Sequence, residues 1–134
     1  MNTGHLQRRW SESRPQVYDK ETRLVCLDIK EEKQTDSEGN EKDGYSYLQV
    51  EIDRQFDYGH VKSQLIEAGF AQKDEFGLLM NAVEGIIGAV AEATSWAKFK
   101  EAVEGTEDIA AFTGFCAFRT ECATAAKAVM ECYK

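Results

Sequence analysis

The chain has 134 residues and a mass of 15.1 kDa, a size at which one domain can bury a core without disulfides. Its formal net charge of -8 and pI near 4.8 argue against general affinity for nucleic acid or an anionic membrane, because neutralising phosphates requires clustered Lys and Arg. With 43% hydrophobic and 10% aromatic residues, the chain is too apolar to stay disordered. We expect one folded domain whose partner is basic or neutral.

Residues 1–22 contain a local excess of basic side chains and the single proline of the chain, Pro15. The simplest interpretation is an N-terminal arm that is partly flexible, because termini fray unless they are tied down. The functional alternative is an arm that docks on a neighbouring subunit through Trp10 and Tyr18. The remainder, residues 23–134, is predicted to form a single α+β domain.

Two segments alternate apolar and polar side chains, which is the pattern of half-buried strands. The apolar members on one side of each segment are Val25, Leu27 and Ile29, then Leu48, Val50 and Ile52. A polar stretch separates the segments, and a reversal centred on Glu38 and Gly39 predicts a β-hairpin over residues 23–53. In that register Ile29 lies opposite Leu48, and all six apolar side chains share one face. Such a ribbon must pack against helices or against another chain.

From Asp57 onward the hydrophobic period changes to that of helices. We predict four helices, over about residues 57–68, 72–92, 95–104 and 107–132. Asp57 and either Ser95 or Thr94 are the expected N-caps of the first and third helices. Gly69 is predicted to end the first helix in a left-handed conformation. Together with the hairpin, these helices predict an α+β fold.

The second predicted helix carries large apolar residues at three- and four-residue steps, which indicates a core-facing stripe. The stripe consists of Phe76, Leu79, Met80, Val83, Ile86, Ile87 and Val90. Three glycines in the same helix (Gly77, Gly85, Gly88) favour the close approach of a neighbour. Trp96, Phe99 and Val103 of the third helix are predicted to face inward.

The last predicted helix is apolar around more than half of its circumference. This breadth favours burial on two sides or a second face covered by another subunit. Arg119 lies among its aromatic residues, and we interpret it as a side chain that reaches solvent or pairs with Glu75 or Glu84 of a neighbouring helix.

Cys26, Cys116, Cys122 and Cys132 form no Cys-x-x-Cys pair, so we expect reduced thiols and no zinc site. No signal-peptide pattern opens the chain, which makes a cytoplasmic location the expectation. The most apolar window, residues 77–93, is too short to cross a bilayer.

The sequence contains no recognisable catalytic or phosphate-binding motif. His60 with Asp57 could form an acid-base pair, but a histidine three residues past a capping aspartate is more often a surface or cap residue. His5 lies in the arm. The chain has no Glu-x-x-His of a di-iron bundle, no Gly-x-Gly-x-x-Gly and no Walker motif. We therefore predict no catalytic, metal-binding or cofactor-binding residue and no cofactor, and we rank an enzyme last.

The segments 58–70 and 73–82 resemble small proteins from prophages and other mobile elements of gut bacteria. In those proteins a β-hairpin precedes a Tyr-x-x-x-Lys-x-x-x-Ile helix, here beginning at Tyr58, and an Asp-Glu helix, here with Asp74. A C-terminal helix then contains Phe-x-x-Phe-Arg, here ending at Arg119. The resemblance implies a gene of a phage tail region or of phage assembly and transfers no catalytic residue.

We predict a non-enzymatic structural, assembly or adaptor protein that binds another protein and forms a homo-oligomer, with the phage or prophage origin that the resemblance implies. The oligomer is expected to use the hairpin edge or the wide face of the last helix, without contacts to nucleic acid or membrane. The predicted interaction residues are Trp10, Tyr18, Tyr45, Tyr47, Phe115, Phe118 and Arg119. The alternative is an acidic regulatory or inhibitory protein that competes for a basic, nucleic-acid-binding partner.

Overall fold

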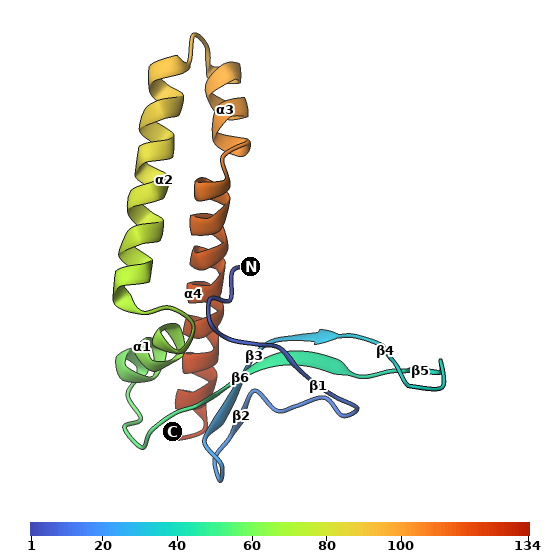
Figure 1. Ribbon diagram of the computed structural model, residues 1–134. Coiled ribbons are helices and arrows are strands. Elements are labelled where there is room, and N and C mark those ends of the chain that lie inside the picture. Colours follow the sequence, from blue (N-terminus) through green and yellow to red (C-terminus); the bar gives the residue numbers. More distant parts are fainter.

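The protein is α+β, as predicted, and a computed structural model describes residues 1–134, with the side chain of residue 92 excepted. Half of the chain is helical and 18% is strand. Figure 1 shows an antiparallel sheet at one end of the molecule and a long helical hairpin that rises away from it. The sheet, the first helix and the lower half of the last helix form the body of the protein.

The element bounds agree closely with the predicted ones in the helical part of the chain. The strands are β1 (Arg9–Ser11), β2 (Tyr18–Asp19), β3 (Leu24–Glu31), β4 (Gln34–Thr35), β5 (Glu41–Lys42) and β6 (Tyr45–Glu51). The helices are α1 (Tyr58–Gly69), α2 (Gln72–Glu92), α3 (Trp96–Glu104) and α4 (Glu107–Glu131).

The predicted hairpin forms the centre of the sheet, whose strand order is β1-β6-β3-β2. The predicted register is wrong by two residues, because Leu27 pairs with Leu48 and Val25 with Val50. Side chains alternate with a period of two, so a slip of two residues leaves each one on its expected face. The difference in register therefore does not change which face of the hairpin is buried.

A β-bulge between Leu27 and Lys30 accounts for one residue of this shift, because the pairing beyond it changes to Lys30 with Ser46. The turn accounts for the other, because the pairing of β4 with β5 centres it on Glu38. Asp28 lies in the bulge with a φ of 49°, and its backbone N–H donates to a carboxylate oxygen of Glu121 on α4 at 2.9 Å. Arg8 holds the other side of the bulge, donating to the Asp28 carboxylate at 2.8 Å and to the Asp28 carbonyl at 2.6 Å. Ile29 is consequently only half-buried and does not join the core cluster.

Residues 1–22 supply two strands that the sequence analysis did not predict. β1 pairs with β6 and β2 pairs with β3, so both long edges of the central hairpin are partly covered by strands of the same chain. The first residues then run across the helices, where the N–H of Asn2 donates to the Gly114 carbonyl and that of His5 to the Gly69 carbonyl.

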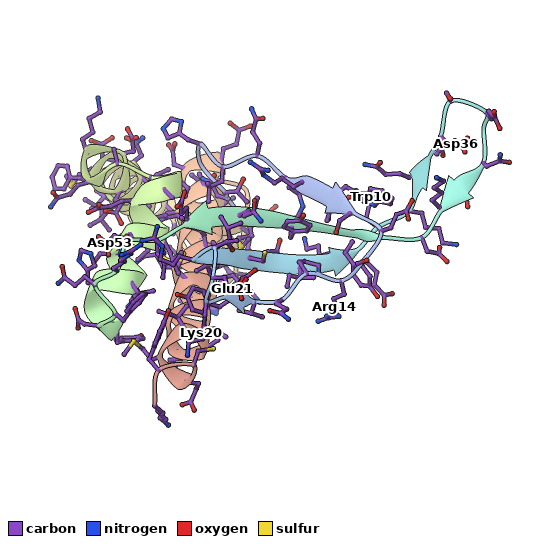
Figure 2. All side chains as sticks on the ribbon, turned by 90° about the horizontal axis from the view of Figure 1, so that it is seen from below. Trp10, Arg14, Lys20, Glu21, Asp36 and Asp53 are labelled. Atoms are coloured by element: carbon purple, nitrogen blue, oxygen red, sulfur yellow. The ribbon has the colours of Figure 1, made fainter. Side chains whose placement is uncertain are left out.

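The distal part of the hairpin, β4 and β5, projects away from the body (Figures 1 and 2). Its turn carries Gly39 at a φ of 86°, and the side chain of Asp36 accepts from the N–H groups of Glu38 and Asn40. A local aspartate that accepts backbone N–H groups is a common way to close a tight turn. The reversal therefore lies at the predicted residues.

The helix ends follow the expected capping chemistry in two of the three predicted places. Asp57 accepts from the N–H of His60, and Ser95 accepts from the N–H of Lys98. The prediction for Gly69 is wrong, because α1 ends into extended backbone at Phe70 and no left-handed residue is involved. A Cβ at Gly69 would lie 3.0 Å from the ring of Phe118, so packing is the reason for this glycine.

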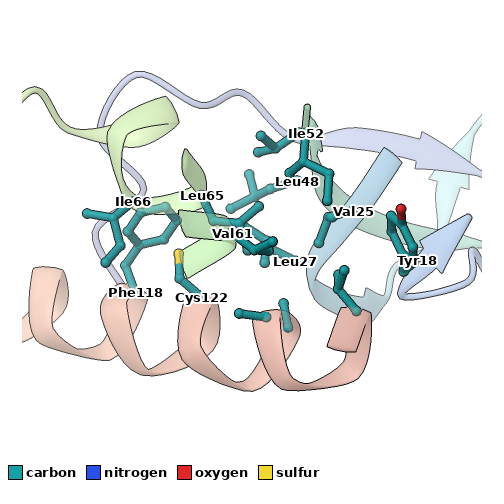
Figure 3. Close-up of a cluster of buried hydrophobic side chains, with 14 of the residues drawn as sticks. Tyr18, Val25, Leu27, Leu48, Ile52, Val61, Leu65, Ile66, Phe118 and Cys122 are labelled. Carbon is teal, nitrogen blue, oxygen red and sulfur yellow. The ribbon is translucent and has the colours of Figure 1, made fainter. Parts of the chain in front are cut away.

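The core lies between the inner face of the sheet, α1 and α4 (Figure 3). Phe118 and Cys122 of α4 contact this core from one side and the strands close it from the other. Near the C-terminal end of α4, the hydroxyls of Tyr18 and Tyr133 form a 2.5 Å hydrogen bond. Burial, followed by this hydrogen bond, raises the pKa of Tyr18 above its ordinary value.

Candidate interaction surface

The large apolar residues of α2 do not face the core, so the prediction of a core-facing stripe is wrong. They are exposed to between 37% and 64% and form one continuous side of the helix. We call this side the α2 outer face. It consists of Phe76, Leu79, Met80, Val83, Ile86, Ile87 and Val90.

A different side of α2 packs against the rest of the chain, and its residues are small. Ala82 and Ala89 are buried, and a Cβ built on Gly85 would lie 3.1 Å from the Thr106 methyl group and 3.6 Å from Ile109. Small side chains let two helices approach closely with little interdigitation of large groups. The neighbour predicted from the glycines thus exists at Gly85, whereas a Cβ at Gly77 would meet no described atom within 4 Å.

The spacing of the outer face is that of a helix that packs along another helix. Phe76, Leu79, Val83, Ile86 and Val90 follow one another at steps of three, four, three and four residues, which are the a and d positions of two heptads. Met80 and Ile87 widen the stripe on one side. At 1.5 Å per residue the stripe extends over about 21 Å, enough for several layers of a helix–helix contact.

The apolar surface continues around the tip of the helical hairpin. Val90, Trp96 and Phe99 line one shallow hollow together with the loop at Ala93 and Ser95. The inward orientation predicted for Trp96 is wrong, since Trp96 is 74% exposed, with its ring centroid 5.5 Å from that of Phe99. Phe99 and Val103 are half-buried.

The outer face carries almost no charge although the protein is strongly acidic. Between Phe76 and Ala91 the one charged residue is Glu84, and at 100° per residue it lies roughly 100° from the middle of the face. Charges begin again at the base of α2, with Lys73, Asp74 and Glu75 in the first turn. Contact at this face would therefore depend on apolar burial and shape.

The interaction residues predicted from the sequence lie elsewhere, and the structure does not bring them together. Phe115 and Phe118 are buried in the core, as is Tyr18. Trp10 is half-buried over Gly44, and its indole N–H donates to the Glu32 carbonyl at 2.8 Å (Figure 2).

Two further predicted interaction residues, Tyr45 and Tyr47, are half-buried on β6. The guanidinium of Arg14 lies 5.8 Å from the ring of Tyr45. Arg119 is exposed and lines a shallow hollow with Lys62 and Cys116, so of the two alternatives it reaches solvent and does not pair with Glu75 or Glu84.

The histidine that could have taken part in acid-base chemistry pairs with a different aspartate from the one considered. The Nε2 of His60 lies 2.8 Å from Asp53, while Asp57 accepts only the backbone N–H of His60. The side chain of Gln64 donates to the same Asp53 carboxylate and accepts its backbone N–H. Hydrogen bonds from His60, then from the Gln55 N–H, lower the pKa of Asp53. The cluster joins the end of β6 to α1.

The chemistry of the remaining side chains is limited. Among the described residues no group of three His, Cys, Asp or Glu side chains is arranged to hold a metal ion. All four cysteines are free thiols, of which Cys26 and Cys122 are buried and Cys116 and Cys132 are exposed. Burial raises the pKa of Cys122 to about 12. Over the part of the chain that the structure describes, no helix is both long and apolar enough to cross a membrane.

Comparison with protein families, with curated proteins and with solved structures finds no match to this chain. The fold class and the surface must therefore be interpreted from their own geometry.

A signal for the outer face was present in the sequence. The segment places large apolar side chains on one side of α2 and only Ala, Gly and Leu78 on the side that packs within the chain. A helix that is apolar on two sides, one of small residues and one of large ones, offers two surfaces for packing.

Proposed function

We propose that this chain is a non-enzymatic structural, assembly or adaptor protein that acts through protein–protein contacts made by the α2 outer face. The observation that carries the proposal is the exposure of seven large apolar side chains on one side of one helix, five of them in heptad spacing. A soluble monomer rarely exposes a contiguous apolar patch of this extent unless the patch is functional. The resemblance of the helices to small prophage proteins supports a role in phage assembly.

A cytoplasmic setting belongs to the same proposal. All four cysteines are unpaired thiols, which is the usual state in a reducing compartment.

Site-specific photo-crosslinking tests the proposal in the cell that naturally makes the protein. A photoreactive phenylalanine analogue replaces Ile87 on the outer face, and a matched control replaces Asn81 on the solvent side of the same helix. We expect protein crosslinks, to this chain or to another, from position 87 and few from position 81. If neither position yields a crosslinked protein, the outer face is not an interaction surface and the proposal is wrong.

A second candidate function is an acidic regulator that binds a basic partner. The distal hairpin favours it, because this projecting element carries Asp36, Glu38, Glu41 and Asp43 against Lys33 and Lys42 (Figure 2). Such binding would weaken steeply as salt is raised, since exposed charges are screened over about 8 Å at physiological ionic strength. Contact through the apolar face would not.

A further inference from the structure

We propose that the α2 outer face is covered by the same face of a second copy of this chain, so that two helical hairpins form a four-helix arrangement. This inference rests on the proposed function and specifies its partner. The pairing is isologous, with one α2 outer face packed on the other about a two-fold axis.

The extent of the face matches what a stable dimer needs. Its seven side chains, at the exposures given above, present on the order of 500 Å² of apolar surface if each contributes roughly 150 Å², the lower end of the range for aromatic side chains. Trp96 at the tip adds to this total, which approaches the ~800 Å² that each partner buries in a standard interface.

The composition of the face favours a copy of itself over a different partner. An interface that selects one different partner commonly uses polar or charged groups that reject the others. The outer face has none of these groups between Phe76 and Val90, apart from Glu84 at its side. A stripe of Val, Ile and Leu in heptad positions is complementary to an identical stripe, since knobs of each helix fit the holes of the other.

The remaining apolar surfaces do not compete for this role. The edges of the central hairpin, predicted as an oligomer contact, pair with β1 and β2 of the same chain. The wide face of α4, the other predicted contact, packs against α1, α2 and β3. An anionic membrane is disfavoured as an occupant, because the net charge is -8 and the face has no basic residue along its length.

The test compares the mass of the purified full chain with that of two variants by sedimentation equilibrium at micromolar concentrations. We expect twice the chain mass of 15.1 kDa for the unmodified protein. Ile87→Glu places a charge inside the paired face and should raise the dissociation constant at least ~100-fold. Asn81→Glu, on the solvent side of α2, is the matched control and should leave the dimer intact.

Circular dichroism on the same samples separates lost pairing from lost folding. Ile87 is exposed within one chain, so Ile87→Glu should retain the helical signal as a monomer. Phe76→Glu, at the other end of the face, provides an independent second variant.

The inference would be overturned by an unmodified chain that stays at 15.1 kDa at the highest concentration, or by a dimer that survives both Ile87→Glu and Phe76→Glu. A monomeric chain that co-sediments with phosphatidylcholine vesicles would also overturn it and assign the face to lipid. If the chain does not form this dimer but position 87 still crosslinks to a different protein in the cell, the proposed function remains supported and only the identity of the partner is wrong.

Discussion

The lower half of α4 and the whole of α2 are both apolar helices, yet they place their large side chains in opposite ways. α4 inserts Phe115, Phe118 and Val129 between the sheet and α1, where they are buried. α2 turns Ala82, Gly85 and Ala89 toward the chain and its large residues toward solvent. The difference shows that an apolar stripe identifies a packing surface without identifying what packs on it.

Thiol reactivity should give the largest contrast between the interior and the surface of α4. Cys116 and Cys132 are exposed, whereas Cys122 is fully buried and its pKa is raised to about 12 by burial. If buried thiols react only after unfolding, Cys122 should react at least ~1,000-fold more slowly than Cys116. A chromogenic disulfide reagent with single-cysteine variants measures both rates, and fast labelling of Cys122 would contradict the packed core.

Replacing one phenylalanine of α4 and one of α2 by alanine should lower the free energy of unfolding by very different amounts. Phe118→Ala removes a fully buried ring and should lower the free energy of unfolding by about 3–5 kcal/mol. Phe76→Ala removes a ring that is 64% exposed and should change it by no more than about 0.5 kcal/mol in the monomer. Urea denaturation at high dilution measures both, and equal losses would show that the outer face is already packed within one chain.

Adding one methyl group should have opposite effects on stability in the N-terminal segment and in α2. Gly4 has a φ of 58°, and a Cβ there would lie 2.0 Å from the Gly69 carbonyl oxygen, so Gly4→Ala should destabilise by ~1–3 kcal/mol. Gly77→Ala fills open space inside a helix and should stabilise by up to ~1 kcal/mol. Thermal denaturation distinguishes the two signs. A stabilising Gly4→Ala would mean that the N-terminal residues do not pack as described.

The smallest expected effect concerns pH. The pKa of Asp53 is lowered in the folded protein, so its hydrogen bonds stabilise the fold above the pKa of an unfolded aspartate, and this stability is lost as pH falls through the folded pKa. Asp53→Asn should therefore flatten the acid limb of a stability-versus-pH curve slightly, because the carboxylate is on the surface. Asp43→Asn on the distal hairpin is the control and should leave the curve unchanged.

Local chemistry was readable from the sequence, and long-range packing was not. The capping residues Asp57 and Ser95 and the change of hydrophobic period set the helix bounds almost to the residue. The bulge at Asp28 was not predictable, because it depends on Arg8 and Glu121, which lie 20 and 93 residues away in the sequence.

The exposed face of α2 was missed for a related physical reason. Periodicity shows which residues share one side of a helix, but it does not show which side packs within the chain. α4 packs against the side of α2 that carries Ala82 and Ala89, because small side chains permit close approach. All the predicted interaction residues except Arg119 are aromatic, and an aromatic side chain such as Phe118 more often fills a core.

The contacts between the two ends of the chain also constrain the order in which it can fold. Tyr18 bonds Tyr133 across 115 residues, and Asn2 reaches Gly114. During synthesis these two contacts can form only after α4 has left the ribosome, and the chain entropy lost in closing such long loops slows the final step. α2 emerges earlier with its apolar side already open, so two nascent copies could meet before either body is complete.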